Sequence, residues 1–283
     1  MAMSVLVSSS RSVNSVAEGI EGALAGSGEP WLPGLAGLLV DAFPLSPAFE
    51  GGRAYGTARW VLSDPTGPRD VAGEVAIARH CALVEILPEE LAGRFGHLAP
   101  ARTVGLAAMD TVSAAVALLG DVPSLAESTG SVVRALHVIH AEAGYDTSHS
   151  EPTIPFSVFV SVPTPGENDA VIRVAESIVH EAMHLQLTLV EGVLPLVAID
   201  GEGFSPWQGR VRPVGGLLHG LYVFSVILRF MDLVADLRPE LSRKARQRRT
   251  EIVEEVASLG DFSGHLTKHG KLLRSRCLAA VGG

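Results

Sequence analysis

The chain is short of cysteine, aromatic residues and charge. Its 283 residues include 2 Cys, 5% aromatic and 19% charged residues. Cys81 and Cys277 are too few for a disulfide framework, so we expect both to be reduced thiols. The segment Met1–Ser15 is rich in serine and lacks the basic stretch and apolar core of a secretory signal peptide. These absences predict a cytoplasmic protein.

Positive charge and long apolar runs are also scarce. Lys and Arg number 22 against 31 Asp and Glu, a net charge of −9 that argues against nucleic acid as the main partner. The basic run Arg243–Arg249 is followed at once by Glu251 and further glutamates, which predicts ion pairing on a solvated helix face. The most apolar stretches, Val104–Leu119 and Leu217–Leu237, are interrupted by polar and charged residues, so no membrane partner is predicted.

The hydrophobic pattern predicts a mainly α fold, a single helical domain over residues 1–283 with a short β element before the motif described next. A period of two over Ile154–Val162 predicts that strand. Residues 150–230 are expected to form the core of the functional site. The helices predicted from apolar periodicity and Gly or Pro breaks are Glu18–Leu24, Leu35–Phe43, Tyr55–Leu62, Val71–Ile86, Ala101–Leu119, Ser124–Ala143, a motif helix from about Asp169 to Val190, Gly216–Leu237, Pro239–Leu259 and Phe262–Ala279.

The motif is His180-Glu181-Ala182-Met183-His184. Two histidines four residues apart on an α-helix lie on one face, so they can bind one divalent ion without bending the backbone. Glu181 lies about 100° round the helix from His180 and can reach a metal-bound water or a substrate. The pattern predicts a metal site, and two protein ligands require a third.

Two residues downstream are candidates for that third ligand. In the metzincin pattern a Gly and a His follow the motif, but Leu187 and Val190 occupy those positions. Glu202, 18 residues after His184, stands in a Gly-rich segment typical of a turn. His219 begins a strongly apolar helix, where an imidazole needs a partner. A metal would provide one, and a backbone carbonyl would provide one if His219 is instead a core histidine. Both candidates stay open at this point.

The segment Ser205–Pro213 contains two arginines, Arg210 and Arg212. An arginine beside an apolar metal pocket can hold a carboxylate through two parallel hydrogen bonds. Pro213 fixes the chain directly after Arg212, which favours Arg212 for this role over the more loop-like Arg210.

Several segments together resemble a known family. They are Glu176–Leu185, Ser205-Pro206-Trp207, Arg212-Pro213 and Leu218-His219-Gly220. They are similar to segments of the 2-oxoglutarate-dependent HExxH-type peptide β-hydroxylases, enzymes of ribosomal peptide natural product biosynthesis. The resemblance is specific from about Pro152 to Phe230. Gln208 departs from it, because the family often has Arg after Pro-Trp.

The resemblance implies a non-haem Fe(II) dioxygenase, an oxidoreductase that uses 2-oxoglutarate and O₂ to hydroxylate a β-carbon in a precursor peptide. Carried over by position, His180, His184 and His219 would bind iron, and Arg212 or Arg210 would hold the C5 carboxylate of 2-oxoglutarate. Glu181 would orient a ligand or the peptide.

Two other hypotheses stand beside it. The first is a zinc peptidase with His180, His184 and Glu202 as ligands and Glu181 as general base. The second is a helical peptide-binding module without a metal.

Overall fold

The computed structural model describes residues 15–26, 28–42, 71–87, 93, 95–142, 144–150, 156–164, 167 and 169–282. The chain divides into two compact units. We call Glu50–Leu185 the sheet unit, and Met1–Phe49 together with Gln186–Gly283 the helical unit. The single-domain assignment made from the sequence stays a prediction, and each unit is described by itself.

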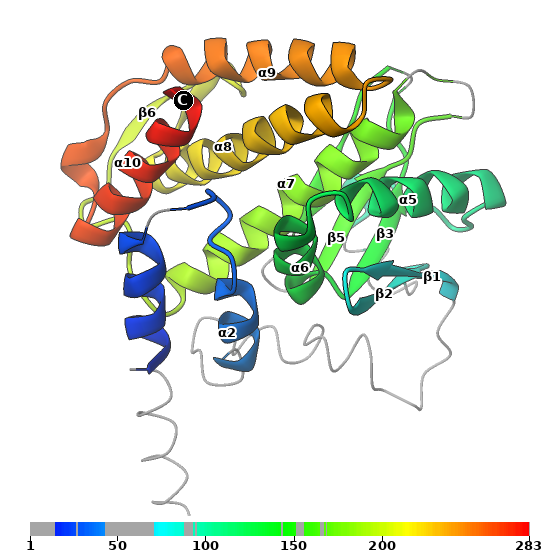
Figure 1. The fold of residues 1–283 in the computed structure, drawn as a ribbon, viewed down its shortest axis with the longest axis horizontal. Coiled ribbons are helices and arrows are strands. Elements are labelled where there is room, and N and C mark those ends of the chain that lie inside the picture. The colour runs from blue at the N-terminus through cyan, green and yellow to red at the C-terminus, as the bar shows by residue number, and fades with distance from the viewer. Residues whose placement is uncertain are drawn as a thin grey trace, which may run out of the picture. The chain divides into compact units, whose positions relative to one another are not determined.

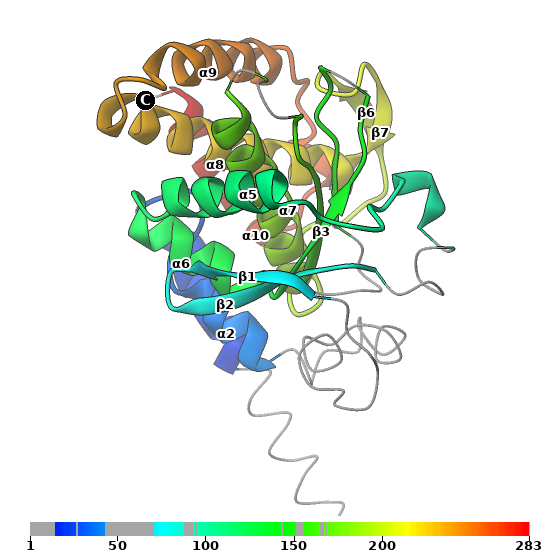
Figure 2. The same ribbon diagram turned by 90° about the vertical axis from the view of Figure 1, so that its right-hand side faces the viewer.

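The sheet unit is built on a five-stranded mixed sheet, whose strands are ordered β1-β2-β3-β5-β4 (Figure 1). The central pairs β2–β3 and β3–β5 are parallel, whereas the outer pairs β1–β2 and β4–β5 are antiparallel. Helices α5 and α6 lie on one side of the β1–β2 ribbon (Figure 2). The elements are β1 (Val71–Ile77), β2 (His80–Glu85), η3 (Gly96–Leu98), α5 (Leu106–Leu119), α6 (Pro123–Val132), β3 (Ala135–Ile139), β4 (Ser148–Ser150), β5 (Ser157–Ser161) and the first part of α7 (Ala170–Glu191).

The sheet overturns the prediction of a mainly α fold with one short β element, because the chain has an α/β fold. The predicted helix Val71–Ile86 is in fact β1 and β2, joined by a turn at Ala78, whose φ is 53°. The predicted helix Ser124–Ala143 ends at Val132 in α6 and continues as β3.

The error has a physical cause in the burial of the strands. Every residue of β3 is buried, so its sequence Ala-Leu-His-Val-Ile lacks the alternation of a half-exposed strand. A short continuous apolar run cannot be told from a buried helical segment by its period. In β1 the alternation is visible only near the end, where buried Val75 and Ile77 flank exposed Ala76.

The helical unit confirms most of the predicted helices. The predicted Tyr55–Leu62 helix lies outside the described residues, whereas a helix over residues 15–25 agrees with the predicted Glu18–Leu24. The other elements are α2 (Leu35–Ala42), the last part of α7, the hairpin of β6 (Glu202–Ser205) and β7 (Arg210–Pro213), α8 (Val214–Leu237), α9 (Ser242–Ala257), η4 (Ser263–His265) and α10 (Lys268–Gly282).

Helix α8 is the core of the helical unit and packs against α9 and α10. By length and composition alone it could cross a membrane, but 78% of its most apolar window is buried inside the protein, as in a core helix. Its Arg229 pairs with Glu29 at 2.9 Å, and its Asp232 with Arg249 at 2.7 Å. These two charged interruptions of the apolar stretch thus have partners.

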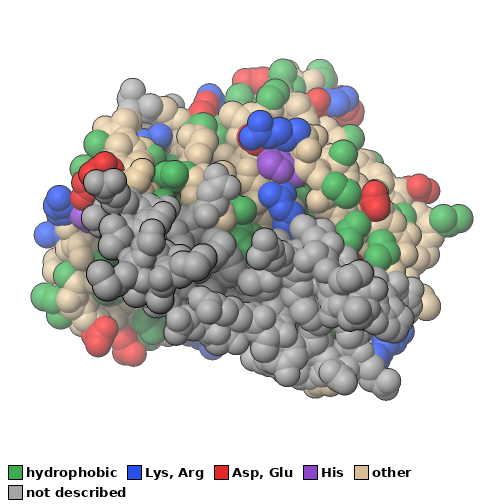
Figure 3. Space-filling view, turned by 90° about the horizontal axis from the view of Figure 1, so that it is seen from below, with side chains coloured by type: hydrophobic (Ala, Val, Ile, Leu, Met, Phe, Trp, Pro, Cys, Tyr) green, Lys and Arg blue, Asp and Glu red, His purple; other side chains and the backbone are tan. Residues whose placement is uncertain are grey.

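Two arginines in the basic run of α9 form ion pairs, which confirms the predicted pairing for this part of the run. Arg248 bonds Glu251 at 3.1 Å, and Arg249 bonds Asp232 of α8. In the view of Figure 3, small groups of acidic and basic side chains alternate with apolar ones on the described part of the surface.

Candidate metal centre

Helix α7 carries the HExxH motif, as the sequence predicted. Its first turn follows Asp169, which adopts the left-handed conformation with φ 61°. Most of the helix is buried, but His180 and His184 share a partly exposed stripe. The helix therefore presents both imidazoles on one face while its other faces build the core.

The structure brings the two motif histidines together. Their Nε2 atoms lie 3.2 Å apart, and their ring planes meet at 64°. Imidazoles that bind one ion with metal–nitrogen bonds of about 2.0–2.1 Å, at angles between octahedral and tetrahedral, have Nε2 atoms roughly 2.9–3.4 Å apart. The pair therefore has the spacing that a shared divalent ion requires, and its donor set fits Fe(II) or Zn²⁺.

Glu181 is buried within the sheet unit, and its side chain is 5% exposed. The hydroxyl of Ser148, on strand β4, donates a 2.7 Å hydrogen bond to Glu181 Oε1. Burial raises the pKa of Glu181, and the hydrogen bonds of Ser148 and Ser150 act in the opposite direction. Glu181 Oε1 lies 3.9 Å from His180 Nε2, which places a carboxyl group of raised proton affinity beside the nitrogen that would face a metal.

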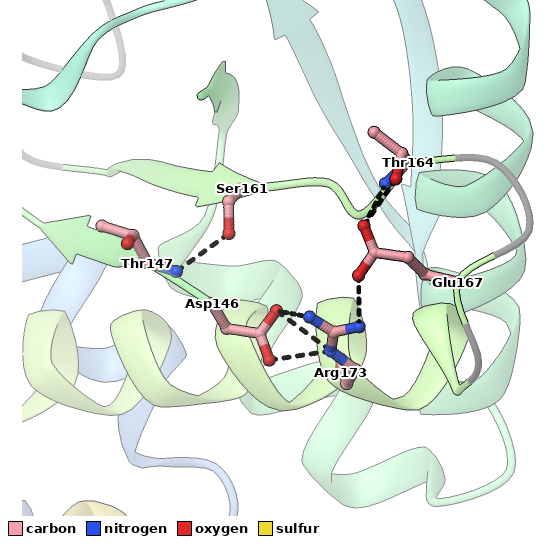
Figure 4. Close-up of polar contacts among 6 residues, drawn as sticks. All are labelled: Asp146, Thr147, Ser161, Thr164, Glu167 and Arg173. Atoms are coloured by element: carbon pink, nitrogen blue, oxygen red, sulfur yellow. Dashed lines mark hydrogen bonds and ion pairs between the residues drawn. The ribbon is translucent and has the colours of Figure 1, made fainter. Parts of the chain in front are cut away.

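A second link fixes strand β4 against the start of α7 (Figure 4). The Arg173 guanidinium donates to both carboxylate oxygens of Asp146, at 2.8–3.1 Å, and to Glu167 at 3.0 Å. These bonds raise the pKa of Arg173, Asp146 being the larger cause. The pKa of Glu167 is lowered to about 2, first by the hydrogen bond of the Thr164 hydroxyl and then by that of Arg173. One residue after Asp146, the backbone N–H of Thr147 donates to Ser161 Oγ of β5. The approach to β4 is therefore held from α7 and from the sheet.

His219 lies on α8 in the helical unit, and its partner is Glu191, a residue that the sequence analysis did not weigh. The His219 Nε2 and Glu191 Oε2 atoms are 2.9 Å apart, and both side chains are partly buried. Glu191 is the last residue of α7, seven residues or about two helical turns after His184. That spacing is the signal by which the sequence could have identified Glu191 as a further carboxylate of the motif helix.

The hairpin of β6 and β7 separates the candidate arginine from the candidate glutamate. Gly203 pairs with Arg212, and Glu202 with Pro213, so these two pairs face opposite sides of the hairpin. A Cβ on Gly216 of α8 would lie 3.2 Å from Arg212 Nη2, which shows that the Arg212 guanidinium lies over the first turns of α8. Exposed Glu202 therefore points away from the helix that carries His219.

Both arginines contact Gln208, the residue that departs from the family pattern. Arg212 Nη1 donates to Gln208 Oε1 at 2.5 Å, and Arg210 Nε to the same atom at 3.1 Å. Arg212 is half-buried and Arg210 exposed. The carbonyl oxygen of the Gln208 side chain thus lies where an oxygen of a ligand carboxylate could bind Arg212.

The structure by itself assigns no third ligand. Within the described ranges, no group of three or more His, Cys, Asp or Glu side chains is arranged to hold a metal ion. The structure places the Nε2 atoms of His180 and His184 close together. That His219 or Glu202 is the third metal ligand remains a prediction.

Comparisons with known proteins add no family. The chain matches no protein-family model and no curated protein.

Proposed function

We propose that this protein is an Fe(II)- and 2-oxoglutarate-dependent dioxygenase that hydroxylates a β-carbon of a residue in a ribosomally made precursor peptide. The observation that carries the proposal is the 3.2 Å separation of the His180 and His184 Nε2 atoms, which suits one shared ion. The family resemblance of residues 152–230 supplies the choice of metal and co-substrate.

The overall reaction balances without any further reductant. Peptide C–H, 2-oxoglutarate and O₂ give peptide C–OH, succinate and CO₂, with one oxygen atom in the hydroxyl group and the other in succinate. The bound iron would supply the activation of O₂. In this proposal His180, His184 and His219 hold the metal.

The remaining residues bind and orient. Arg212 would hold the C5 carboxylate of 2-oxoglutarate through parallel N–H···O bonds, replacing the carbonyl oxygen of Gln208. Its position over the first turns of α8, half-buried, supports it over exposed Arg210. Glu181 has no base chemistry in this reaction, and its bond to Ser148 supports a role in orienting the substrate side of the site.

The test measures co-substrate turnover. Purified protein supplied with Fe(II), 2-oxoglutarate and O₂ should release succinate, and His180→Ala should abolish the release. Zn²⁺-loaded protein is the matched inactive control. Stoichiometric Fe(II) binding without succinate release would overturn the proposal.

One observation favours a second candidate, a zinc peptidase. Glu181 lies 3.9 Å from His180 Nε2 and its pKa is raised, as suits a general base acting on metal-bound water. The outward direction of Glu202 weighs against the ligand set that this hypothesis requires. Zn²⁺-loaded protein would then cleave fluorogenic peptides and Glu181→Gln would abolish cleavage, whereas the dioxygenase would keep releasing succinate with Gln at this position.

A further inference from the structure

Strand β4 ends the sheet beside the metal motif. Among the described residues it pairs with β5 alone, so its other edge meets no described strand. A sheet edge exposes backbone N–H and C=O groups that an extended chain can pair with.

The register shows which groups point outward. Thr147 exchanges hydrogen bonds with Ser161, since its carbonyl accepts from the Ser161 N–H at 2.8 Å and its N–H donates to Ser161 Oγ. Alternate residues of an antiparallel strand direct their backbone groups to the same side. His149, paired with Phe159, therefore faces β5, and Ser148 and Ser150 direct their N–H and C=O groups to the outer edge.

The side chains of this strand show which face looks at the motif. Both Ser148 and Ser150 hydrogen-bond Glu181, the residue that follows His180 on α7. His149 lies on the opposite face, with its ring centroid 6.2 Å from that of Phe159. A chain paired with the edge of β4 would thus turn every second side chain to the α7 face.

We propose that the substrate peptide binds in an extended conformation as an additional strand on the outer edge of β4, pairing with the backbone of Ser148 and Ser150. This inference deepens the proposed function and rests on it for the identity of the occupant. In a strand paired in this way, the β-carbon of every second peptide residue lies on the same face as Glu181 and the motif helix. That arrangement agrees with oxidation at a β-carbon, whereas the peptide bonds lie in the plane of the sheet.

The edge is suited to a transient ligand. It is only three residues long and therefore offers few main-chain hydrogen bonds. Binding through so few bonds depends strongly on each one. The bonds from Arg173 to Asp146 and from Thr147 to Ser161 hold the strand in place before the peptide arrives.

The test removes an outward N–H without removing a bond of the sheet. Ser150→Pro and Ser148→Pro each delete one donor at the edge, a position where proline is tolerated in strands. Ser150→Ala and Ser148→Ala are the matched controls, because they lose only the hydroxyl groups that bond Glu181. The probe is a fluorescein-labelled peptide selected on the full-length metal-free protein from a library of random 12-residue peptides, and its affinity is measured by fluorescence anisotropy.

We expect the proline variants to bind the probe at least about 10-fold more weakly, and the alanine variants to stay within about 3-fold of the parent protein. N-methylation of alternate probe residues should abolish binding with a period of two, a result that needs no protein variant to fold. Equal binding by proline and alanine variants, a library without a binder, or a dimer that the proline variants convert to a monomer would each overturn the inference. All these measurements omit iron and 2-oxoglutarate, so they can fail while succinate release succeeds, or the reverse.

Discussion

Ser148 donates a 2.7 Å hydrogen bond to Glu181, and this bond joins the edge strand of the sheet to the residue between the two motif histidines. A second link, from Arg173 to Asp146, joins α7 about two turns earlier to the segment that leads into β4. The motif helix and β4 are therefore positioned together. Within the sheet unit, the residues around His180 and the strand edge of β4 are therefore linked by hydrogen bonds.

Metal binding should depend on both motif histidines. His180→Ala and His184→Ala should each weaken Fe(II) or Zn²⁺ binding by more than about 100-fold, because each removes one of few ligands. Equilibrium dialysis followed by elemental analysis measures the loss. His140→Ala is the control, since His140 is exposed in the same unit and should leave binding unchanged. Stoichiometric metal in both motif variants would contradict the assignment.

The two arginines of the hairpin should differ in their effect on 2-oxoglutarate. Arg212→Ala should weaken anaerobic binding of 2-oxoglutarate to the Fe(II) protein by about 100-fold, the value of two charge-assisted hydrogen bonds. Exposed Arg210 is the matched control, and Arg210→Ala should change affinity less than about 3-fold. Isothermal calorimetry gives both values. A reversed order of the two effects would move the anchor to Arg210.

Two glycines of α8 should respond in opposite ways to alanine. A Cβ on Gly220 would overlap Trp207 Cζ2, so Gly220→Ala must displace the indole and should lower the free energy of unfolding by about 1–3 kcal/mol. At Gly215 the nearest contact would be 3.9 Å away. Gly215→Ala should therefore be neutral or stabilise the protein by up to about 1 kcal/mol through helix propensity. Urea denaturation compares them, and equal stability of the two variants would refute the close packing of Trp207.

The sequence predicted those elements whose signals are local. Helices such as α8 have long apolar patterns, and the motif spacing in α7 fixes the direction of two side chains by helix geometry alone. The spacing of His180 and His184 was predictable for that reason. The sheet was not, because β3 is buried on both faces and its partners come from distant parts of the chain.

Contacts between elements that lie far apart in the sequence could not be predicted either. The role of Ser148 depends on the register of β4 with β5, which no local pattern encodes. The opposite directions of Glu202 and Arg212 follow from the pairing within one hairpin. The register of this hairpin could not be inferred from the sequence, because each strand is only four residues long and its alternating pattern is too short to fix the pairing.

The stability of the protein should fall on acidification because of one buried histidine. His137, on β3, stacks on Phe159 at 4.8 Å between ring centroids, and its Nδ1 donates to the Glu85 carbonyl. Burial lowers the pKa of His137 to about 4, and the bond to Glu85 acts in the opposite direction. In the unfolded chain this histidine has a pKa of about 6.5, so it binds the proton more tightly there than in the folded protein. The stabilising effect of the neutral ring is therefore complete above that value and is lost as pH falls towards 4.

The size of this loss is on the order of 3 kcal/mol for one fully buried imidazole. His137→Phe keeps a ring against Phe159 but removes the titrating group. Its free energy of unfolding, measured in urea at a series of pH values from 7 to 4, should fall less steeply than that of the parent protein. His140→Ala, which replaces an exposed histidine of the same unit, is the control and should follow the parent slope. Parallel curves for His137→Phe and the parent would mean that acid sensitivity arises elsewhere in the sheet unit.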